Sequence, residues 1–121
     1  MEIYITTIFA KNDHEDQVMK FYADQEESLQ RTEGFHGRQI FKARPGTMVE
    51  AVRKVLTEEE MARHAEAEGP QGVHFVIIER WDTIDQKTTY SRSVDGGRAA
   101  DLIPHLLPEH THEYYSDVTP S

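Results

Sequence analysis

Two strand-like segments constrain the fold most, because each carries apolar residues on both of its faces. Residues 72–81 (GVHFVIIERW) alternate in a strand so that one face carries Val73, Phe75, Ile77, Glu79 and Trp81, and the other carries His74, Val76, Ile78 and Arg80. Residues 2–9 (EIYITTIF) divide in the same way into Ile3, Ile5, Thr7 and Phe9, and Tyr4, Thr6 and Ile8. Strands of this kind need cover on both sides of the sheet.

Further helices and strands follow from local signals. The stretch KNDHED predicts a helix start with Asn12 or Asp13 as N-cap, and the helix continues to about residue 31. FHGRQIFKA (35–43) predicts a second strand after the glycine-containing turn TEGFHG. Asp82 or Thr83 caps a helix that runs to about residue 93, and HTHEYYSDV (110–118) predicts a last strand, with its histidines on one face.

Residues 47–71 stand apart from this pattern. TMVE (47–50) and TEEE (57–60) both fit the Thr-x-x-Glu capping box, so residues 48–67 form one or two helices, while MVEAVRKVL (48–56) also fits a strand. The remaining order, β-α-β-β-α-β, predicts an α+β ferredoxin-like sandwich with a four-stranded antiparallel sheet. We expect one domain over residues 1–121, with a helical insertion at 47–71, and a second subunit that covers the helix-free face.

Charge and composition limit the classes of binding partner that the chain can have. Asp and Glu number 22 against 13 Lys and Arg, a net charge of -9, which disfavours nucleic acid and anionic membrane surfaces. No apolar run approaches the roughly 20 residues of a membrane span. The N-terminal residues show no basic stretch of a signal peptide, and the chain has no cysteine for disulfides or thiolate zinc sites. These features predict a soluble cytoplasmic protein.

The segments TEGFHGRQIF and FVIIERWDTIDQKTTYSRS resemble the antibiotic biosynthesis monooxygenase-like family of dimeric α+β barrel proteins. The matching positions are a Glu-Gly-Phe-x-Gly turn after a helix and a strand that ends in Trp before a helix, here Glu33, Gly34, Phe35 and Gly37, then Glu79 and Trp81. The resemblance implies a homodimer with a small-molecule cavity between each sheet and its helices. Members of the family oxidise aromatic polyketides without a cofactor, degrade haem, or have no known activity.

The haem-degrading branch is not matched here. It uses an Asn in the first strand, a Trp in the second main helix and a later His. The corresponding positions of this chain are Thr6 or Thr7, Tyr90, and residues 91–104, which contain no His. A helix His common in other members would also fall at Tyr90. We therefore expect no haem and no other cofactor, and no catalytic set transfers from the family residue by residue.

Three histidines are predicted as general bases, because a neutral imidazole accepts protons near pH 7. They are His36 beside the glycine turn, His74 at the start of the third strand, and His112 in the last strand, and we expect His36 and His74 to reach the same cavity mouth. The alternative is that each is a solvated strand residue. His110 and His112 could converge on a metal ion, but they lack a spaced third ligand, so no metal site is predicted.

Four residues are predicted to bind substrate. Arg38 and Arg80 are charges in half-buried strands and could hold a carboxylate or phenolate, or form a cross-strand ion pair instead. Trp81 and Tyr90 could stack on an aromatic ring, or anchor the core.

The sequence leaves three functions open. The first is a cofactor-independent monooxygenase acting on an aromatic or enol-like substrate. The second is a non-catalytic dimeric protein that binds small molecules or serves in stress. The third is a partner-binding dimer that uses the acidic segment 57–68.

Overall fold

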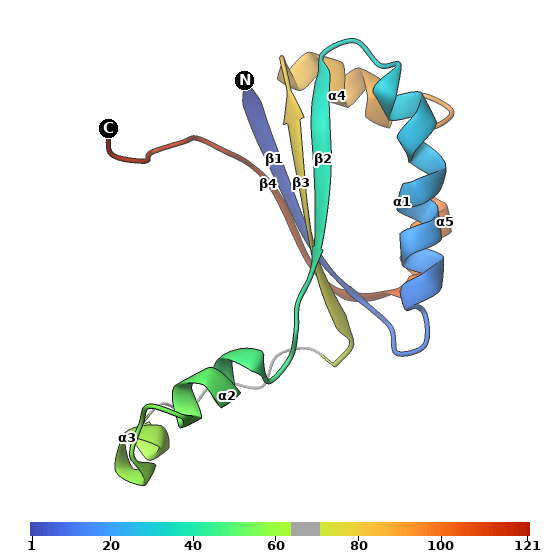
Figure 1. Ribbon diagram of the computed structural model, residues 1–121. Helices are drawn as coiled ribbons and strands as arrows, with labels where there is room; N and C mark the ends of the chain where they lie inside the picture. Colours follow the sequence, from blue (N-terminus) through green and yellow to red (C-terminus); the bar gives the residue numbers. More distant parts are fainter. Residues whose placement is uncertain (64–70) are drawn as a thin grey trace.

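A four-stranded antiparallel sheet with helices along one face forms the body of the computed structural model (Figure 1). The structure describes residues 1–63 and 71–121. In chain order the elements are β1 (Glu2–Ala10), α1 (Glu15–Gln30), β2 (Phe35–Lys42), α2 (Thr47–Arg53), α3 (Glu58–Arg63), β3 (Val73–Trp81), α4 (Ile84–Ser91), α5 (Ala99–Leu102), a 3-10 turn (Ile103–His105) and β4 (Leu106–Tyr115).

The strand order β2-β3-β1-β4 places the first strand inside the sheet, with β3 and β4 as its neighbours. This is the ferredoxin-like arrangement, and the predicted α+β fold class is confirmed. Ile8 lies opposite Phe75 and Thr6 opposite Ile77, so the face of β3 that carries Trp81 is the face covered by helices. Among the described residues, no helix is both long and apolar enough for a bilayer span.

Two clusters of buried side chains join the helices to the sheet. The larger one holds Ile8, Ala10, Val18, Tyr22, Phe75, Ile77 and Leu102. The smaller one holds Leu29, Trp81 and Tyr90, with Phe35 packed against it. Their α1 members, Val18, Tyr22 and Leu29, are spaced at helical intervals, which is why this face of α1 turns inward.

Of the two N-caps predicted for α1 and α4, the one for α4 is confirmed and the one for α1 is wrong. Thr83 caps α4, and its side chain accepts a hydrogen bond from the Gln86 amide. Helix α1 starts later than predicted: its N-cap is His14, and the prediction of Asn12 or Asp13 is wrong. Asp13 instead has a φ of 68°, a left-handed turn conformation that Asp tolerates better than most residues.

The Glu-Gly-Phe turn joins α1 to β2 by a tight backbone path. Gly34 has a φ of +87°, and its carbonyl accepts a hydrogen bond from the Asp82 amide at 2.8 Å. A side chain at Gly34 would collide with that of Gln86. Glycine is therefore favoured for its conformation, whereas the flexible end of Gln86 can move aside, and this turn holds the start of β2 beside the end of β3.

The described part of the segment between β2 and β3, residues 43–63, forms two short helices, so the helical alternative for residues 48–56 is correct at least to Arg53. The capping box at 57–60 is present, with reciprocal hydrogen bonds between Thr57 and Glu60. The box at 47–50 is absent, because α2 is preceded by Gly46 as its N-cap. The rest of the helix predicted to residue 67 runs into residues outside the described part.

Candidate functional site

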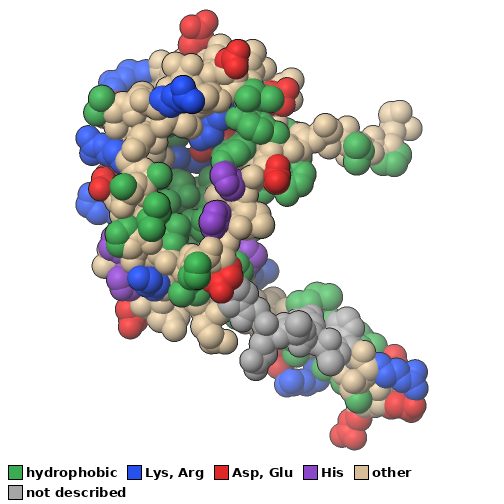
Figure 2. All heavy atoms as spheres, turned by 180° about the vertical axis from the view of Figure 1, so that it is seen from behind, with side chains coloured by type: hydrophobic (Ala, Val, Ile, Leu, Met, Phe, Trp, Pro, Cys, Tyr) green, Lys and Arg blue, Asp and Glu red, His purple; other side chains and the backbone are tan. Residues whose placement is uncertain are grey.

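A hollow lies between the helix layer and the sheet, on the side where β4 forms the edge (Figure 2). Helix α4 has eight residues, or about 12 Å, whereas the ten residues of β4 extend for about 33 Å. Residues 108–113 of β4 are exposed, so the helices leave this part of the strand uncovered. Figure 2 shows hydrophobic side chains inside this hollow and histidines at its rim. It is a concave, largely apolar site open to solvent.

Three charged side chains meet between the sheet and the helices: Arg38 from β2, Glu79 from β3 and Lys87 from α4. Glu79 Oε1 lies 3.2 Å from Lys87 Nζ, and Glu79 Oε2 lies 3.8 Å from Arg38 Nη1. The Arg38 and Glu79 side chains are 1% and 7% exposed. Charges as buried as these are tolerated only with partners, so the three side chains form one interdependent charge cluster.

Arg38 is held by α1 as well as by Glu79. Its guanidinium donates to the Gln25 side chain at 3.0 Å, the Tyr22 carbonyl at 2.6 Å and the Glu26 carboxylate at 2.7 Å. Its Nε is buried and has no hydrogen-bond partner among the described residues. A buried donor left unpaired costs about 1–3 kcal/mol. An acceptor that reached this nitrogen would recover that cost.

Glu79 also connects the charge cluster to the aromatic residues. The indole Nε1 of Trp81 donates to Glu79 Oε1 at 3.0 Å. Lys87 Nζ lies 4.9 Å from the centre of the Tyr4 ring, within the range of a cation–π contact. The ammonium group of Lys87 thus lies between a carboxylate and an electron-rich ring.

Tyrosines and a histidine line the sheet next to the charge cluster. The Tyr4 hydroxyl lies 3.0 Å from His112 Nδ1, and the Tyr4 and Tyr114 rings are 4.9 Å apart. Burial raises the pKa of Tyr4, although the Thr6 hydroxyl acts against this, and the negative charge of Glu79 raises it further. Burial also raises the pKa of Tyr114. Both phenols therefore stay protonated at neutral pH and can donate hydrogen bonds.

The three histidines predicted as bases do not converge. His112 lies on the helix-facing side of β4, opposite Thr6. His36 lies at the end of the sheet near Trp81, where it bonds to Asp82 at 2.6 Å. His74 lies at the other end, on the helix-free face, with its ring stacked on Phe9 at 4.5 Å. The prediction that His36 and His74 reach one cavity mouth is wrong, because β3 separates them by its full length.

The two predicted arginines are separated by the sheet. Arg38 lies on the helix-facing side opposite Glu79, and Arg80 lies on the helix-free face, where it donates to Gln39 at 3.2 Å. Successive residues of a strand point to opposite sides, so Glu79 and Arg80 cannot serve one site. Of the two arginines, Arg38 is the one on the helix-facing side, where its side chain is buried.

Trp81 and Tyr90 lie together in the smaller core cluster. Their ring centres are 6.0 Å apart, and Phe35 packs edge-on against the indole at 5.2 Å. Trp81 has no exposed surface, and the Tyr90 hydroxyl bonds to Ser28 at 2.9 Å. In this structure both residues support the fold, with the indole N–H fixing the carboxylate of Glu79.

His110 and His112 are neighbours but are already engaged. Their ring centres are 5.7 Å apart; His110 Nδ1 lies 2.8 Å from its own strand's Pro108 carbonyl, and His112 bonds to Tyr4. Within residues 1–63 and 71–121, no group of three or more His, Asp or Glu is placed to hold a metal ion.

No chemical role was predicted for Glu79, Lys87 or Tyr4. The sequence does carry a signal for Glu79 and for Lys87. Glu79 interrupts the apolar face of β3 between Ile77 and Trp81, and a carboxylate there requires a buried partner. Lys87 precedes Tyr90 by one helical turn, so both point toward the sheet. The partner of Glu79 could therefore have been sought three residues before the inward-facing Tyr90.

Solved structures with the same fold are numerous, whereas no protein-family model and no curated protein sequence matches the chain. An antibiotic biosynthesis monooxygenase is 18% identical and has a TM-score of 0.64, with 98% of this chain and 100% of the other covered. Protein Rv0793 of Mycobacterium tuberculosis is 9% identical, with a TM-score of 0.66 and coverages of 99% and 97%.

A point variant of SnoaB, a cofactor-independent oxygenase from Streptomyces nogalater, is 9% identical, with a TM-score of 0.62 and coverages of 98% and 94%. These likenesses span nearly the whole of each chain, and they confirm at the level of fold the resemblance carried by the Glu-Gly-Phe turn and Trp81. The chain has the α+β ferredoxin-like fold of the antibiotic biosynthesis monooxygenases.

Proposed function

We propose that the chain is a cofactor-independent monooxygenase that oxidises an aromatic or enol-like small molecule in the hollow between sheet and helices. The observation that carries this proposal is the juxtaposition of a cation, Lys87, with a histidine–phenol pair, His112 and Tyr4, at the sheet surface. A site of this kind can accept a proton from a weakly acidic substrate and stabilise the anion that results. SnoaB, which shares the fold, is a cofactor-independent oxygenase.

In the proposed reaction, His112 acts as the base. With its Nδ1 proton donated to the Tyr4 oxygen, Nε2 is free to take a proton from an activated CH₂ group next to a phenolic ring. The carbanion reduces O₂ and forms a C–O bond, which gives a hydroperoxide after proton return from His112. Loss of water then leaves a carbonyl. The substrate loses two hydrogens and gains one oxygen, and the second oxygen leaves as water.

Lys87 is proposed to stabilise the developing phenolate, and Arg38, whose side chain is buried, to hold Glu79 and α1 in position. His36, His74 and Arg80 have no part in this reaction, because they lie at the sheet end or on the helix-free face. Trp81 and Tyr90 act as positioning residues: the first bonds to Glu79 and the second packs against the first.

The same proposal includes a homodimer that acts in the cytoplasm without nucleic acid, membrane, haem or metal. Its support is the helix-free face, where Ile5, Val76 and Ile78 are only half-buried and Phe41 is 48% exposed. A second copy laid sheet to sheet would cover these side chains, and a twofold axis makes the face complementary to itself.

An oxygen-uptake assay tests the reaction. Anthrone-type probes, which carry a CH₂ group between phenolic rings, should be converted to the quinone with one O₂ consumed per product. His112→Ala should lower the rate by about 10²-fold or more, and His110→Ala, on the same strand, should not change it. A rate equal to that of the uncatalysed reaction in buffer, across a panel of such probes, would overturn the proposal.

A second function, binding without turnover, is favoured by one observation. Glu79 and Glu26 already neutralise the two cations of the charge cluster, which weakens their field on a substrate anion. Quenching of Trp81 fluorescence by a phenolic probe, without oxygen uptake, would support this function, since the indole bonds directly to Glu79.

A further inference from the structure

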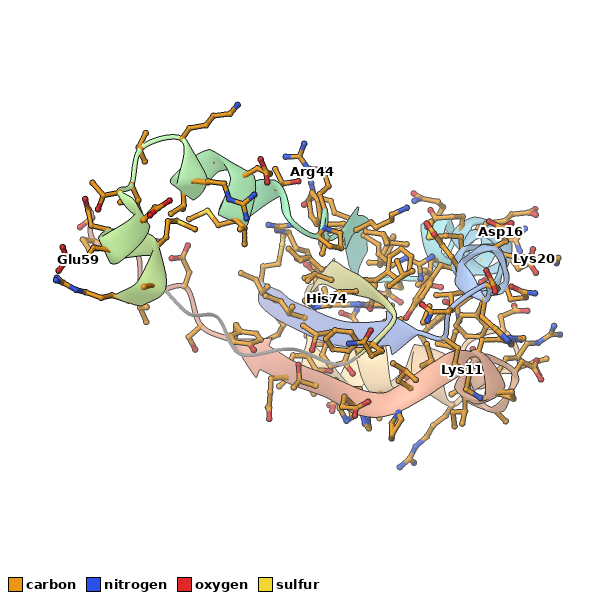
Figure 3. All side chains as sticks on the ribbon, turned by 90° about the horizontal axis from the view of Figure 1, so that it is seen from below. Lys11, Asp16, Lys20, Arg44, Glu59 and His74 are labelled. Atoms are coloured by element: carbon orange, nitrogen blue, oxygen red, sulfur yellow. The ribbon has the colours of Figure 1, made fainter. Side chains whose placement is uncertain are left out.

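Residues 44–63, here called the arm, extend from the end of β2 away from the body (Figure 1). The arm contains α2 and α3, and it projects on the side of the sheet that has no helices. Figure 3 shows Glu59 at its far end, with Lys20 and Asp16 of α1 on the opposite side of the sheet. The arm therefore lies next to the helix-free face and far from the hollow.

The polar contacts of the arm are internal to it. Its side-chain ion pairs join Arg53 to Glu50 and Arg63 to Glu59, and its capping box joins Thr57 to Glu60. None of the hydrogen bonds and ion pairs of residues 44–63 found within the described part of the chain reaches the body. No polar contact that the structure describes fixes the arm to the body.

The arm also exposes apolar side chains. Met48 is 62% and Val55 is 79% exposed, and no residue of α2 or α3 is buried. Helices of seven and six residues are too short to be stable alone in water. Such helices need an apolar surface to pack against; among the described residues of the arm, Val49, Val52, Leu56 and Met61 are half-buried, whereas Met48 and Val55 stay exposed.

The total accessible surface area of the chain is larger than that of a compact monomer of the same mass. The chain exposes 8822 Å² for a mass of 14.0 kDa, whereas a compact monomer of this size exposes about 6,700 Å². The excess, about 2,100 Å², belongs to the arm and the extended residues 116–121 as well as to the helix-free face, and it is comparable with the area that one subunit contributes to a large homodimer interface. The helix-free face and the arm adjoin each other, so one partner molecule could cover both.

We propose that the arm clasps the second subunit of a homodimer. When the two helix-free faces pack together, each arm lies along the side of the partner and buries Met48 and Val55 there. This inference rests on the homodimer of the proposed function and extends it: the insertion between β2 and β3 determines the strength of dimerisation. Because a twofold interface repeats every contact, one substitution in the arm removes two.

Sedimentation equilibrium on the full-length chain tests the clasp. The variant with both Met48→Glu and Val55→Glu should raise the dimer Kd by about 100-fold or more, since four apolar side chains would become charged within one dimer. The matched control carries both Val94→Glu and Ile103→Glu, which add the same two negative charges at residues 81% and 66% exposed outside the arm, and its Kd should equal that of the wild type. All variants should keep the far-UV circular dichroism spectrum of the wild type, which shows that each still folds; melting temperatures are not compared, because dimerisation itself raises them.

A second variant separates failure of the clasp from failure of the dimer. Phe41→Glu charges the helix-free face itself and should abolish dimerisation. If Phe41→Glu is monomeric while the arm variant dimerises like the wild type, the clasp is overturned and the sheet-to-sheet dimer stands. A wild-type protein that is monomeric at all concentrations overturns both, while leaving the oxygen-uptake test of the proposed function unaffected.

Cross-linking gives an independent reading. The chain has no cysteine, so Val55→Cys creates a unique thiol for a benzophenone label. Irradiation should yield a covalent dimer whose cross-linked peptide comes from the partner's strands. Met19→Cys, on the outer side of α1, should yield none. Equal dimer yields from the two positions, or cross-links from Val55→Cys only within its own chain, would overturn the clasp.

Discussion

Lys87 Nζ and Glu79 Oε1 lie 3.2 Å apart, and this ion pair connects helix α4 to strand β3 at the charge cluster. Lys87 is 16% exposed and Glu79 is 7% exposed. The pair is therefore much less screened by water than the surface pair of Lys20 and Asp24, whose side chains are 75% and 63% exposed.

Lys87→Met should destabilise the protein, because it keeps the aliphatic stem but leaves Glu79 with a weaker set of partners. We expect a loss of about 2 kcal/mol in the free energy of unfolding, somewhat below that of a fully buried pair, since Arg38 and the Trp81 indole remain. Urea unfolding measures it. Glu79→Gln in the same chain should restore part of the loss, whereas Lys20→Met should change stability by about 0.5 kcal/mol or less. Equal effects of the two lysine variants would contradict a special role for the pair.

His112→Ala should separate function from stability. His112 is exposed on β4 and its main contact is the Tyr4 hydroxyl, so we expect a change in unfolding free energy of about 1 kcal/mol or less. Oxygen uptake should fall by at least about 10²-fold. The neighbouring His110→Ala should affect neither quantity, and it should leave the dimer intact. A variant at either position that unfolds or dissociates would show that these histidines are structural.

Trp81→Ala should be severely destabilising, by about 3–5 kcal/mol. The indole is fully buried between Phe35 and Tyr90, and its N–H also satisfies Glu79. Trp81→Phe keeps most of the packing and loses the hydrogen bond, so its cost should be smaller, about 1–3 kcal/mol. Chemical denaturation followed by far-UV circular dichroism compares the two. A stable Trp81→Ala protein would place the indole in the ligand-binding hollow.

Alkaline unfolding should depend on Tyr22. Burial raises the pKa of Tyr22 well above its ordinary value of 10.0, despite the opposing charge of Arg38. A raised pKa in the folded state means that the unfolded chain releases this proton first. The contribution to stability is therefore complete below pH 10 and is lost as the pH rises above it. Tyr22→Phe removes this titration, so its unfolding free energy should fall less steeply from pH 10 to 11.5, with little difference at pH 7.

Much of the fold could be predicted because alternation and helical spacing are local signals. The faces of β1 and β3, the inward stripe of α1 and the Thr83 cap all follow from residues close in sequence. The cap of α1 could not be placed correctly, since Asn12, Asp13 and His14 are adjacent and the choice depends on the path of the preceding turn. The Lys11 amide bonds to the His105 carbonyl at 2.9 Å, and this long-range contact fixes that path.

The candidate site was harder to predict because strand register determines it. Arg38 was singled out for its charge, but its partner Glu79 became evident only once β2 was aligned with β3. The same alignment separates Arg38 from Arg80, and His112 from His74. Composition gave the correct residue types, whereas the assignment of each residue to a face and an end of the sheet required the pairing of strands distant in the sequence.

The strand order has a consequence for how the protein is synthesised. The partners of β1 are β3, which begins at Val73, and β4, which begins at Leu106. β2 is made earlier but does not pair with β1, so the nascent chain carries an apolar strand without a neighbour until more than half of the sequence has emerged. Non-local pairing of this kind slows folding and leaves apolar segments open to aggregation. The sheet can be completed only after β4, a strand of ten residues, has been synthesised. Co-translational folding of the sheet is therefore limited by the synthesis of β4.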